Sequence, residues 1–327
     1  AMQVAQRGTS ATTTTSTFVV DRFNTAIVGE NEASTTAQIT LTSSDTGPWA
    51  KGFRNALQIT NGNQTGGAGG GDTQQLTYMV EAQDIAQSGW DYTSASSYIT
   101  LSFWVKSSVA QNFYGYLRSE DGTKQSYPFE TGSLSANTWT KVTKTVPGNS
   151  NIQIDNNNGP GFLICLYAFE GTDKTGSVSL NTWAAYASST RTPDNTSTWW
   201  TTNDATFAVT GVQLEVGDTA TEFEHRSYAD ELQRCLRYYE ILAKREAGSG
   251  GVYAYMGMWY SASEFTASIK FQVDKRAIPT FEQVSGTNFY TCYGGSLSDQ
   301  INSWTGAQAP SRRVTTIYNN NTVSGGT

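Results

Sequence analysis

The chain has 327 residues, enough for two domains or for one large β-sandwich with an appendage. Its formal net charge is −7, and no cluster of lysine and arginine is present to neutralise phosphates, so a nucleic-acid-binding surface is not expected. The apolar stretches fall well short of the roughly 18 residues of a membrane-spanning helix, which argues against insertion into a membrane.

Composition favours a β protein with a neutral polar surface. Charged residues make up only 15% of the chain, aromatic residues make up 12%, and Thr, Ser, Asn, Gln and Gly are abundant. Because β-branched and aromatic side chains favour strands while Gly, Asn and Asp form turns, many short strands are expected. The N-terminal residues show no signal peptide and look like the middle of a longer protein.

Strand character begins with the segment Phe18–Phe23, after a Thr-rich start. Side chains alternate clearly in residues 98–106, where Ile99, Leu101, Phe103 and Val105 share one face. Turn-forming stretches separate the strands, and no helical pattern intervenes, so the sequence predicts a sandwich or a barrel. The predicted strands lie at about 36–42, 53–60, 75–81, 97–107, 112–118, 139–146, 161–169 and 206–216.

A long insertion between about 170 and 205 offers the best candidate ligand site. Loops of this length in compact domains are usually functional or disordered. Aromatic faces can cover the apolar side of a sugar while polar groups take its hydroxyls. The alternative for the Trp199–Trp200 pair is that both rings fill the core. The candidate glycan-binding residues are Trp183, Tyr186, Arg191, Asp194, Trp199 and Trp200.

A helix is predicted at about 228–247. Ser227 is a suitable N-cap with Asp230 three residues later, and Gly248 is a natural stop. Its apolar stripe either packs on the chain's own sandwich or gathers around a symmetry axis, most plausibly a threefold one. The candidate oligomer-interface residues are Tyr228, Leu232, Cys235, Tyr239 and Leu242.

Strand character returns at 252–260 and 266–273. A region of about 75 residues would have only a small core, so it is expected to dock onto the large domain or onto neighbouring chains. The C-terminal residues look unfinished, and this region is expected to be incomplete.

The sequence shows few of the residue patterns that catalysis or metal binding requires. The single histidine, His225, is expected to make a structural hydrogen bond, and the three cysteines have neither disulfide nor metal-site spacing; Cys165 is expected in the core. The Gly66–Gly71 run lacks the lysine of a phosphate-binding loop. Glycoside hydrolysis needs only two carboxylates, but no pattern among the 28 acidic residues selects a pair. We therefore expect a protein that is not an enzyme, with no cofactor and no metal site.

Several motifs resemble structural proteins of tailed bacteriophages that carry a carbohydrate-binding-module-like jelly roll. The phage resemblance is carried by Met2–Thr9, Phe18–Phe23, Gly211–Gly217 and Glu231–Tyr239. The similarity to carbohydrate-binding-module jelly rolls is carried by Ser102–Ser108, Tyr114–Tyr116 and Asn137–Val142. Lys275–Thr280 is similar to an "MRAxPT" strand of those proteins, with Lys in place of the Met. The resemblance implies a jelly roll at 1–222, a linking helix at 223–248 and a small β domain at 249–327.

The resemblance also implies a place in the virion, with assembly in the host cytoplasm. The expected function is that of a tail or head fibre that contacts a host surface polysaccharide for receptor binding and attachment, as a homotrimer among other virion proteins. A purely architectural decoration or adaptor protein is the main alternative, and a glycan-degrading depolymerase is the third. Sugar binding rests here on analogy of fold alone.

Overall fold

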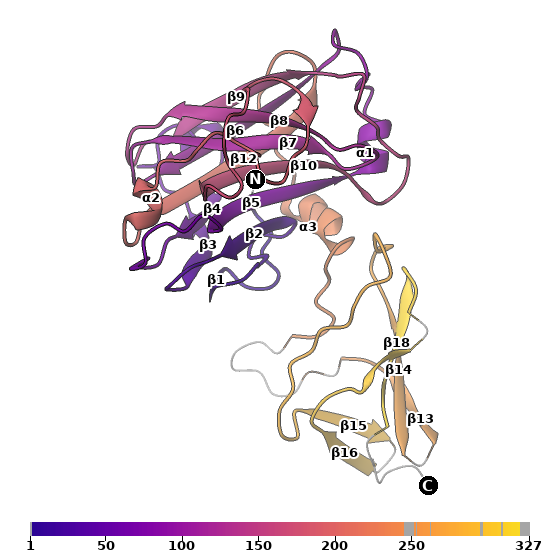
Figure 1. Cartoon of the computed structure of the whole chain (residues 1–327). Helices are drawn as coiled ribbons and strands as arrows, with labels where there is room; N and C mark the ends of the chain where they lie inside the picture. The colour runs from indigo at the N-terminus through magenta and orange to yellow at the C-terminus, as the bar shows by residue number, and fades with distance from the viewer. Residues whose placement is uncertain are drawn as a thin grey trace. The chain divides into compact units, whose positions relative to one another are not determined.

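The computed structural model describes residues 2–244, 252, 254–261, 263–294, 297–308 and 310–320. The chain divides into two compact units, Ala1–Glu231 and Leu232–Thr327. The first unit contains two large sheets, whereas the second contains a four-stranded sheet and a hairpin (Figure 1).

The first unit is a sandwich of two six-stranded antiparallel sheets. In spatial order the first sheet consists of β1 (Ser10–Thr13), β3 (Ser34–Thr40), β4 (Asn55–Thr60), β12 (Thr206–Val216), β6 (Tyr98–Ser107) and β9 (Thr140–Pro147). The second sheet consists of β11 (Ala184–Ala185), β8 (Gln125–Ser133), β7 (Asn112–Ser119), β10 (Pro160–Glu170), β5 (Thr73–Glu81) and β2 (Phe23–Val28). The chain crosses repeatedly between the sheets, and the fold is an all-β jelly-roll sandwich.

Short helical turns connect some of these strands. They are η1 (Trp49–Lys51), α1 (Ala82–Ala86) and α2 (Thr198–Thr201). The eight predicted strands correspond to β3, β4, β5, β6, β7, β9, β10 and β12, with ends that differ by a few residues. Strand β8 was not predicted, because Pro128 interrupts its pattern.

The core lies between the two sheets and follows the predicted alternation. Ile99, Leu101, Phe103 and Val105 of β6 all point inward and are at most 3% exposed. The segment Phe18–Phe23 differs from its prediction, since it forms turns and β2 begins only at Phe23. Val19 and Val20 are nevertheless buried in the same core, so the apolar signal of this segment reflects burial.

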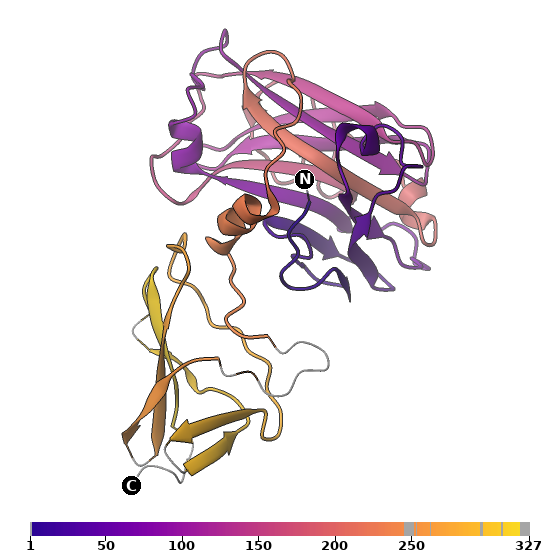
Figure 2. The same cartoon turned by 180° about the vertical axis from the view of Figure 1, so that it is seen from behind.

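The outer face of the first sheet is covered by the chain itself. Residues 41–54, including η1, lie across it and bury Leu41 and Phe53 against Trp139 (Figure 2). His225 closes this layer, because its Nε2 lies 2.7 Å from the Lys51 carbonyl oxygen and its ring packs 5.0 Å from that of Phe53. The single histidine thus makes a structural contact in this layer.

The predicted helix is shorter than expected, since α3 spans Tyr228–Leu236. Its start follows the prediction: the Asp230 N–H donates to Ser227 Oγ at 3.2 Å, and that hydroxyl donates to the Asp230 carboxylate at 2.6 Å. Its end is set by other segments. Lys275 Nζ donates to the Leu236 carbonyl, and the Arg276 N–H donates to the Arg237 carbonyl at 3.0 Å. These carbonyls would otherwise accept the next helical hydrogen bonds.

The early end of α3 removes the predicted apolar stripe. Tyr239 and Leu242 lie beyond the helix, Cys235 is buried, and Tyr228 is 56% exposed. With Leu232 they do not form one helical face, so the prediction of a five-residue interface stripe is wrong. Gly248, the expected stop, lies outside the described residues. Association of chains stays a prediction.

The second unit is built around a small sheet. Its spatial order is β13 (Gly257–Ser261), β14 (Glu264–Lys270), β18 (Val314–Asn319) and β17 (Gly306–Gln308), and β15 (Tyr290–Gly294) pairs with β16 (Leu297–Ile301). Phe265, Ile269 and Ile317 are central to its core, against which Leu242 packs.

Residues 275–280 do not form the strand that the resemblance implied. Lys275 is buried instead, and its ammonium group pairs with Glu240 and lies 4.9 Å from the centre of the Phe271 ring. The side chains of Lys275 and Glu240 are 4% and 6% exposed. The buried charge of Lys275 is therefore accompanied by a buried partner of opposite charge.

Candidate functional site

Two of the candidate glycan-binding residues belong to the core. Trp199 and Trp200 lie on α2 and are 0% exposed. Trp199 Nε1 donates to the Thr206 carbonyl at 3.0 Å, and Trp200 Nε1 donates to the Gly67 carbonyl at 2.7 Å. Since neither ring reaches the surface, the prediction that they bind a glycan is wrong and the alternative, that both rings fill the core, holds.

Two others hold the insertion in place. Trp183 packs against Tyr127 and Phe162 at the rim of the core, and its Nε1 donates to the Pro147 carbonyl at 2.6 Å. Asp194 accepts a hydrogen bond of 2.6 Å from the Thr175 hydroxyl. The contacts of both side chains are structural, although Asp194 remains exposed.

The remaining two, Tyr186 and Arg191, lie on the outer face of the second sheet. The insertion reaches this face because β11 pairs with β8 and the Tyr186 N–H donates to the Lys124 carbonyl at 2.9 Å. The half-buried Tyr186 ring lies 6.0 Å from that of Tyr116. The guanidinium carbon of Arg118 lies 4.3 Å from the centre of the Tyr186 ring, a cation–π contact.

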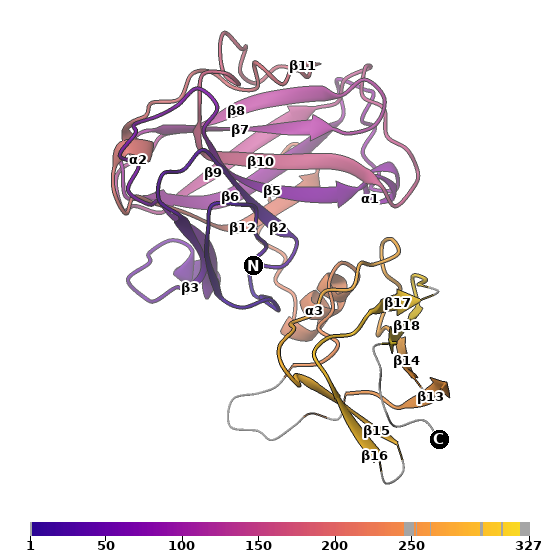
Figure 3. The ribbon, with the colours of Figure 1, turned by 60° about the horizontal axis from the view of Figure 1, so that its bottom comes forward.

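Three neighbouring strands supply the floor of this face (Figure 3). On β7, Tyr116 and Arg118 point outward, and the register places them beside Cys165 and Leu163 of β10. The next strand, β5, places Thr77 beside Cys165. We call this surface, with Tyr114, Tyr167, Gln75 and Met79, the outer face of the second sheet.

Sequence reasoning missed this floor although a signal was present. In β7, Tyr114, Tyr116 and Arg118 alternate with Phe113 and Leu117, so both faces of the strand carry large side chains. A strand with one face in the core and aromatic residues on the other must bury the second face as well or present it to a partner.

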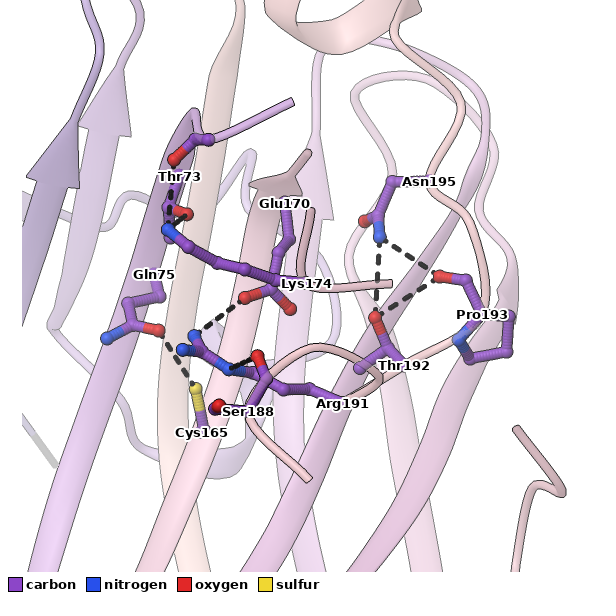
Figure 4. A network of polar contacts seen from close by, with 11 residues as sticks. Thr73, Gln75, Cys165, Glu170, Lys174, Ser188, Arg191, Thr192, Pro193 and Asn195 are labelled. Atoms are coloured by element: carbon purple, nitrogen blue, oxygen red, sulfur yellow. Dashed lines mark hydrogen bonds and ion pairs between the residues drawn. The ribbon is translucent and has the colours of Figure 1, made fainter. Parts of the chain in front are cut away.

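An ion pair lies beneath the insertion on this face. Arg191 Nη1 lies 2.8 Å from Glu170 Oε1, and the Glu170 side chain is 0% exposed (Figure 4). Burial raises the pKa of Glu170 to about 7, although Arg191 and Lys174 act in the opposite direction. Burial opposes the charge of Arg191, but Tyr167 and Glu170 outweigh it and raise the pKa of Arg191.

The Tyr167 hydroxyl belongs to the same cluster. Its hydrogen bonds favour the charged forms of both Glu170 and Arg191. Tyr167 and Glu170 are at most 1% exposed.

A second ion cluster lies at the other side of Tyr186. Arg118 Nε donates to Glu120 Oε1 at 2.6 Å, and Lys124 Nζ donates to Glu120 Oε2 at 2.6 Å. Burial lowers the pKa of Arg118, but Tyr116 and Glu120 outweigh it and raise that pKa. Both guanidinium groups therefore stay charged beside Tyr186.

This arrangement has the chemistry to hold a polar ligand. It offers a half-exposed aromatic ring flanked by fixed donors, which is the chemistry by which proteins hold sugars. Among the described residues, no group of three or more His, Cys, Asp or Glu side chains could hold a metal ion. None of the helices described is long and apolar enough to cross a membrane.

No protein-family model matches the sequence, and no curated protein matches it. The chain is similar to the enzymatically active domain of a tailspike protein of bacteriophage CBA120, with 9% identity and a TM-score of 0.29 over 64% of this chain and 19% of that domain. It is also similar to a family 11 carbohydrate-binding module from Clostridium thermocellum, solved with a mixed-linked tetrasaccharide, with 11% identity and a TM-score of 0.28 over 64% of this chain and 96% of that module. For a CBM4 structure the identity is 13% and the TM-score 0.26, over 50% and 84% of the two chains.

Proposed function

We propose that the first unit is a non-enzymatic glycan-binding module of a phage virion protein, in a tail or head fibre that contacts host surface polysaccharide. The motifs at residues 2–9, 18–23 and 211–217 support the virion assignment through their resemblance to phage structural proteins. The homotrimer, the neighbouring virion proteins and assembly in the host cytoplasm belong to the same proposal.

The observation that carries the proposed glycan binding is the half-exposed Tyr186 ring. It lies over the guanidinium of Arg118 and beside Tyr116, on a sheet face that the insertion crosses. A ring held from behind in this way loses little conformational freedom when a sugar covers its outer side. Sugar hydroxyls would then meet the polar groups of Arg118, Lys124 and Arg191.

A purely architectural role is the second candidate. It is favoured by Trp183, Trp199 and Trp200, whose indole N–H groups all donate to backbone carbonyls of the chain itself. In that role the insertion would only stabilise the sandwich. A depolymerase is the third candidate, and the release of reducing sugar from host polysaccharide is the measurement that would establish it.

Glycan-array binding of the purified chain and of Tyr186→Ala tests the proposal. Loss of one stacking aromatic is expected to weaken binding by about tenfold, since aromatic contacts contribute about 1 kcal/mol or more. Tyr98→Ala, which removes a 36%-exposed tyrosine from the first sheet, is the matched control and should bind as the native chain does. If the chain binds no host polysaccharide, or if both variants lose binding equally, the result would favour the purely architectural role.

The virion assignment has its own test. Labelled antibodies against the chain, viewed on intact particles, should mark a fibre. Native mass measurement of the isolated protein is expected to give three chains per particle. A monomer would remove the homotrimer from the proposal, and an absence of label from intact particles would remove the fibre.

A further inference from the structure

The charges on the outer face of the second sheet are unevenly matched. Glu120 contacts both Arg118 and Lys124. Glu170 contacts Arg191 at 2.8 Å, and Lys174 also acts on its charge. Figure 4 shows the Arg191 guanidinium paired with Glu170, whereas the Lys174 ammonium donates to the Thr73 hydroxyl at 2.8 Å. Four cations therefore accompany the two carboxylates Glu120 and Glu170 on this face.

Tyr186 lies between the two clusters. The guanidinium carbon of Arg118 lies 4.3 Å from the centre of its ring. Arg191 folds back onto the same part of the insertion, where its Nε donates to the carbonyl of Ser188, two residues from Tyr186, at 3.1 Å. The half-buried ring of Tyr186 is thus accompanied by the positive charges of Arg118 and Arg191. This local excess contrasts with the formal net charge of −7 for the whole chain.

Other carboxylates nearby face other partners. Glu130 accepts a hydrogen bond of 2.7 Å from Asn112 and acts on Lys144. It lies four residues along β8 from Ser126, the neighbour of Arg118, a separation of about 13 Å in an extended strand. On the insertion, Asp194 accepts from Thr175, and Asp173 lies against the Gly70 turn.

From this geometry we infer that the outer face of the second sheet selects a sugar chain that carries anionic groups, with Tyr186 under a sugar ring and the two cation clusters on its acidic substituents. Arginine is suited to this role, because its planar guanidinium group can stay paired with a glutamate of the protein and still present N–H donors to an acidic group of the ligand. Lys124 is 43% exposed and supplies a solvent-accessible positive charge beside Glu120. This inference rests on the proposed glycan binding and adds the ligand's charge to it.

Affinity electrophoresis of the full chain through three polymers tests the inference: polygalacturonate carries carboxylates, dextran sulfate carries sulfates, and dextran is neutral. Retardation by either anionic polymer, weakening as salt is added, is the expected result. The two anionic polymers then distinguish carboxylate from sulfate as the preferred group. Retardation by dextran alone would overturn the inference and leave glycan binding intact. A chain that binds no polymer here and no glycan on the array would contradict both.

Three variants test whether anionic polymers bind to the outer face of the second sheet. Lys124→Gln removes an exposed charge without breaking the Arg118–Glu120 pair and is expected to weaken anionic binding about threefold. Arg118→Gln should weaken it about tenfold or more. Lys141→Gln removes an equal charge from the exposed surface of β9 in the first sheet and serves as the control. Circular dichroism confirms that each variant is folded. Equal losses for Lys124→Gln and Lys141→Gln would show unspecific charge attraction and overturn the inference.

Discussion

Glu170→Gln is expected to make the first unit more stable than the native chain above pH 7. Burial raises the pKa of Glu170 from 4.5 to about 7, so the folded chain keeps a proton that the unfolded chain has lost. The stabilisation from this proton is complete below pH 4.5 and disappears as the pH rises through 7. The difference between the two pKa values corresponds to about 3 kcal/mol. Glutamine does not ionise and can still accept from Arg191, so the variant avoids this loss.

Urea unfolding of both proteins from pH 4.5 to about 8 measures the effect. Trp199 and Trp200 are buried in the first unit, so their fluorescence reports its unfolding. The difference between the two free energies of unfolding removes the contributions of the titrating groups that both proteins share. This difference should be near zero at the acid end and approach 3 kcal/mol in favour of the variant at the alkaline end.

The opposite result would refute the reasoning. If the native chain is the more stable protein at pH 8, the attraction between Glu170 and Arg191 outweighs the cost of burying the carboxylate. A difference that does not change with pH would instead show that Glu170 titrates alike in the folded and unfolded chains.

Trp200→Ala should destabilise the first unit by about 3–5 kcal/mol in thermal unfolding, because it empties a fully buried site beside Phe169; a loss below about 1 kcal/mol would contradict that burial. Lys275→Met leaves Glu240 buried without its cation and should cost the second unit about 3 kcal/mol in urea unfolding. Adding Glu240→Leu should restore most of this stability, and a double variant as unstable as the single one would argue against the pair. Ser227→Ala should cost about 1 kcal/mol through loss of the N-cap, as measured by helical circular dichroism on heating, and an unchanged transition would show that the cap contributes little.

The strands of the sandwich were predictable because their pattern is local. Alternation in β6 assigns Phe103 to the core and Trp104 to the outside, and the structure has both arrangements. The helix start was local too, since Ser227 and Asp230 cap it directly. The end of α3 could not be predicted from a local pattern. It depends on a hydrogen bond that the Leu236 carbonyl accepts from Lys275, which lies 39 residues later in the sequence.

The candidate site was only partly predictable for the same reason. Six residues of the insertion were equivalent in the sequence, yet tertiary packing sends Trp199 and Trp200 into the core and leaves Tyr186 at the surface. The floor beneath Tyr186 comes from β7 and β10, whose pairing no periodicity reveals. Glu170 lies at the end of β10, and nothing in the sequence indicates that its side chain is buried.

The two ends of the insertion meet, and this has an evolutionary consequence. Thr175 and Thr192 form a β-bridge, and the Gly176 N–H donates to the Thr192 carbonyl at 3.0 Å. A loop whose ends are already joined can change in length at little entropic cost to the remainder of the fold. Residues 177–190 can therefore change in length around Trp183 while the sandwich persists, and under the proposed function such changes would alter the specificity of the surface.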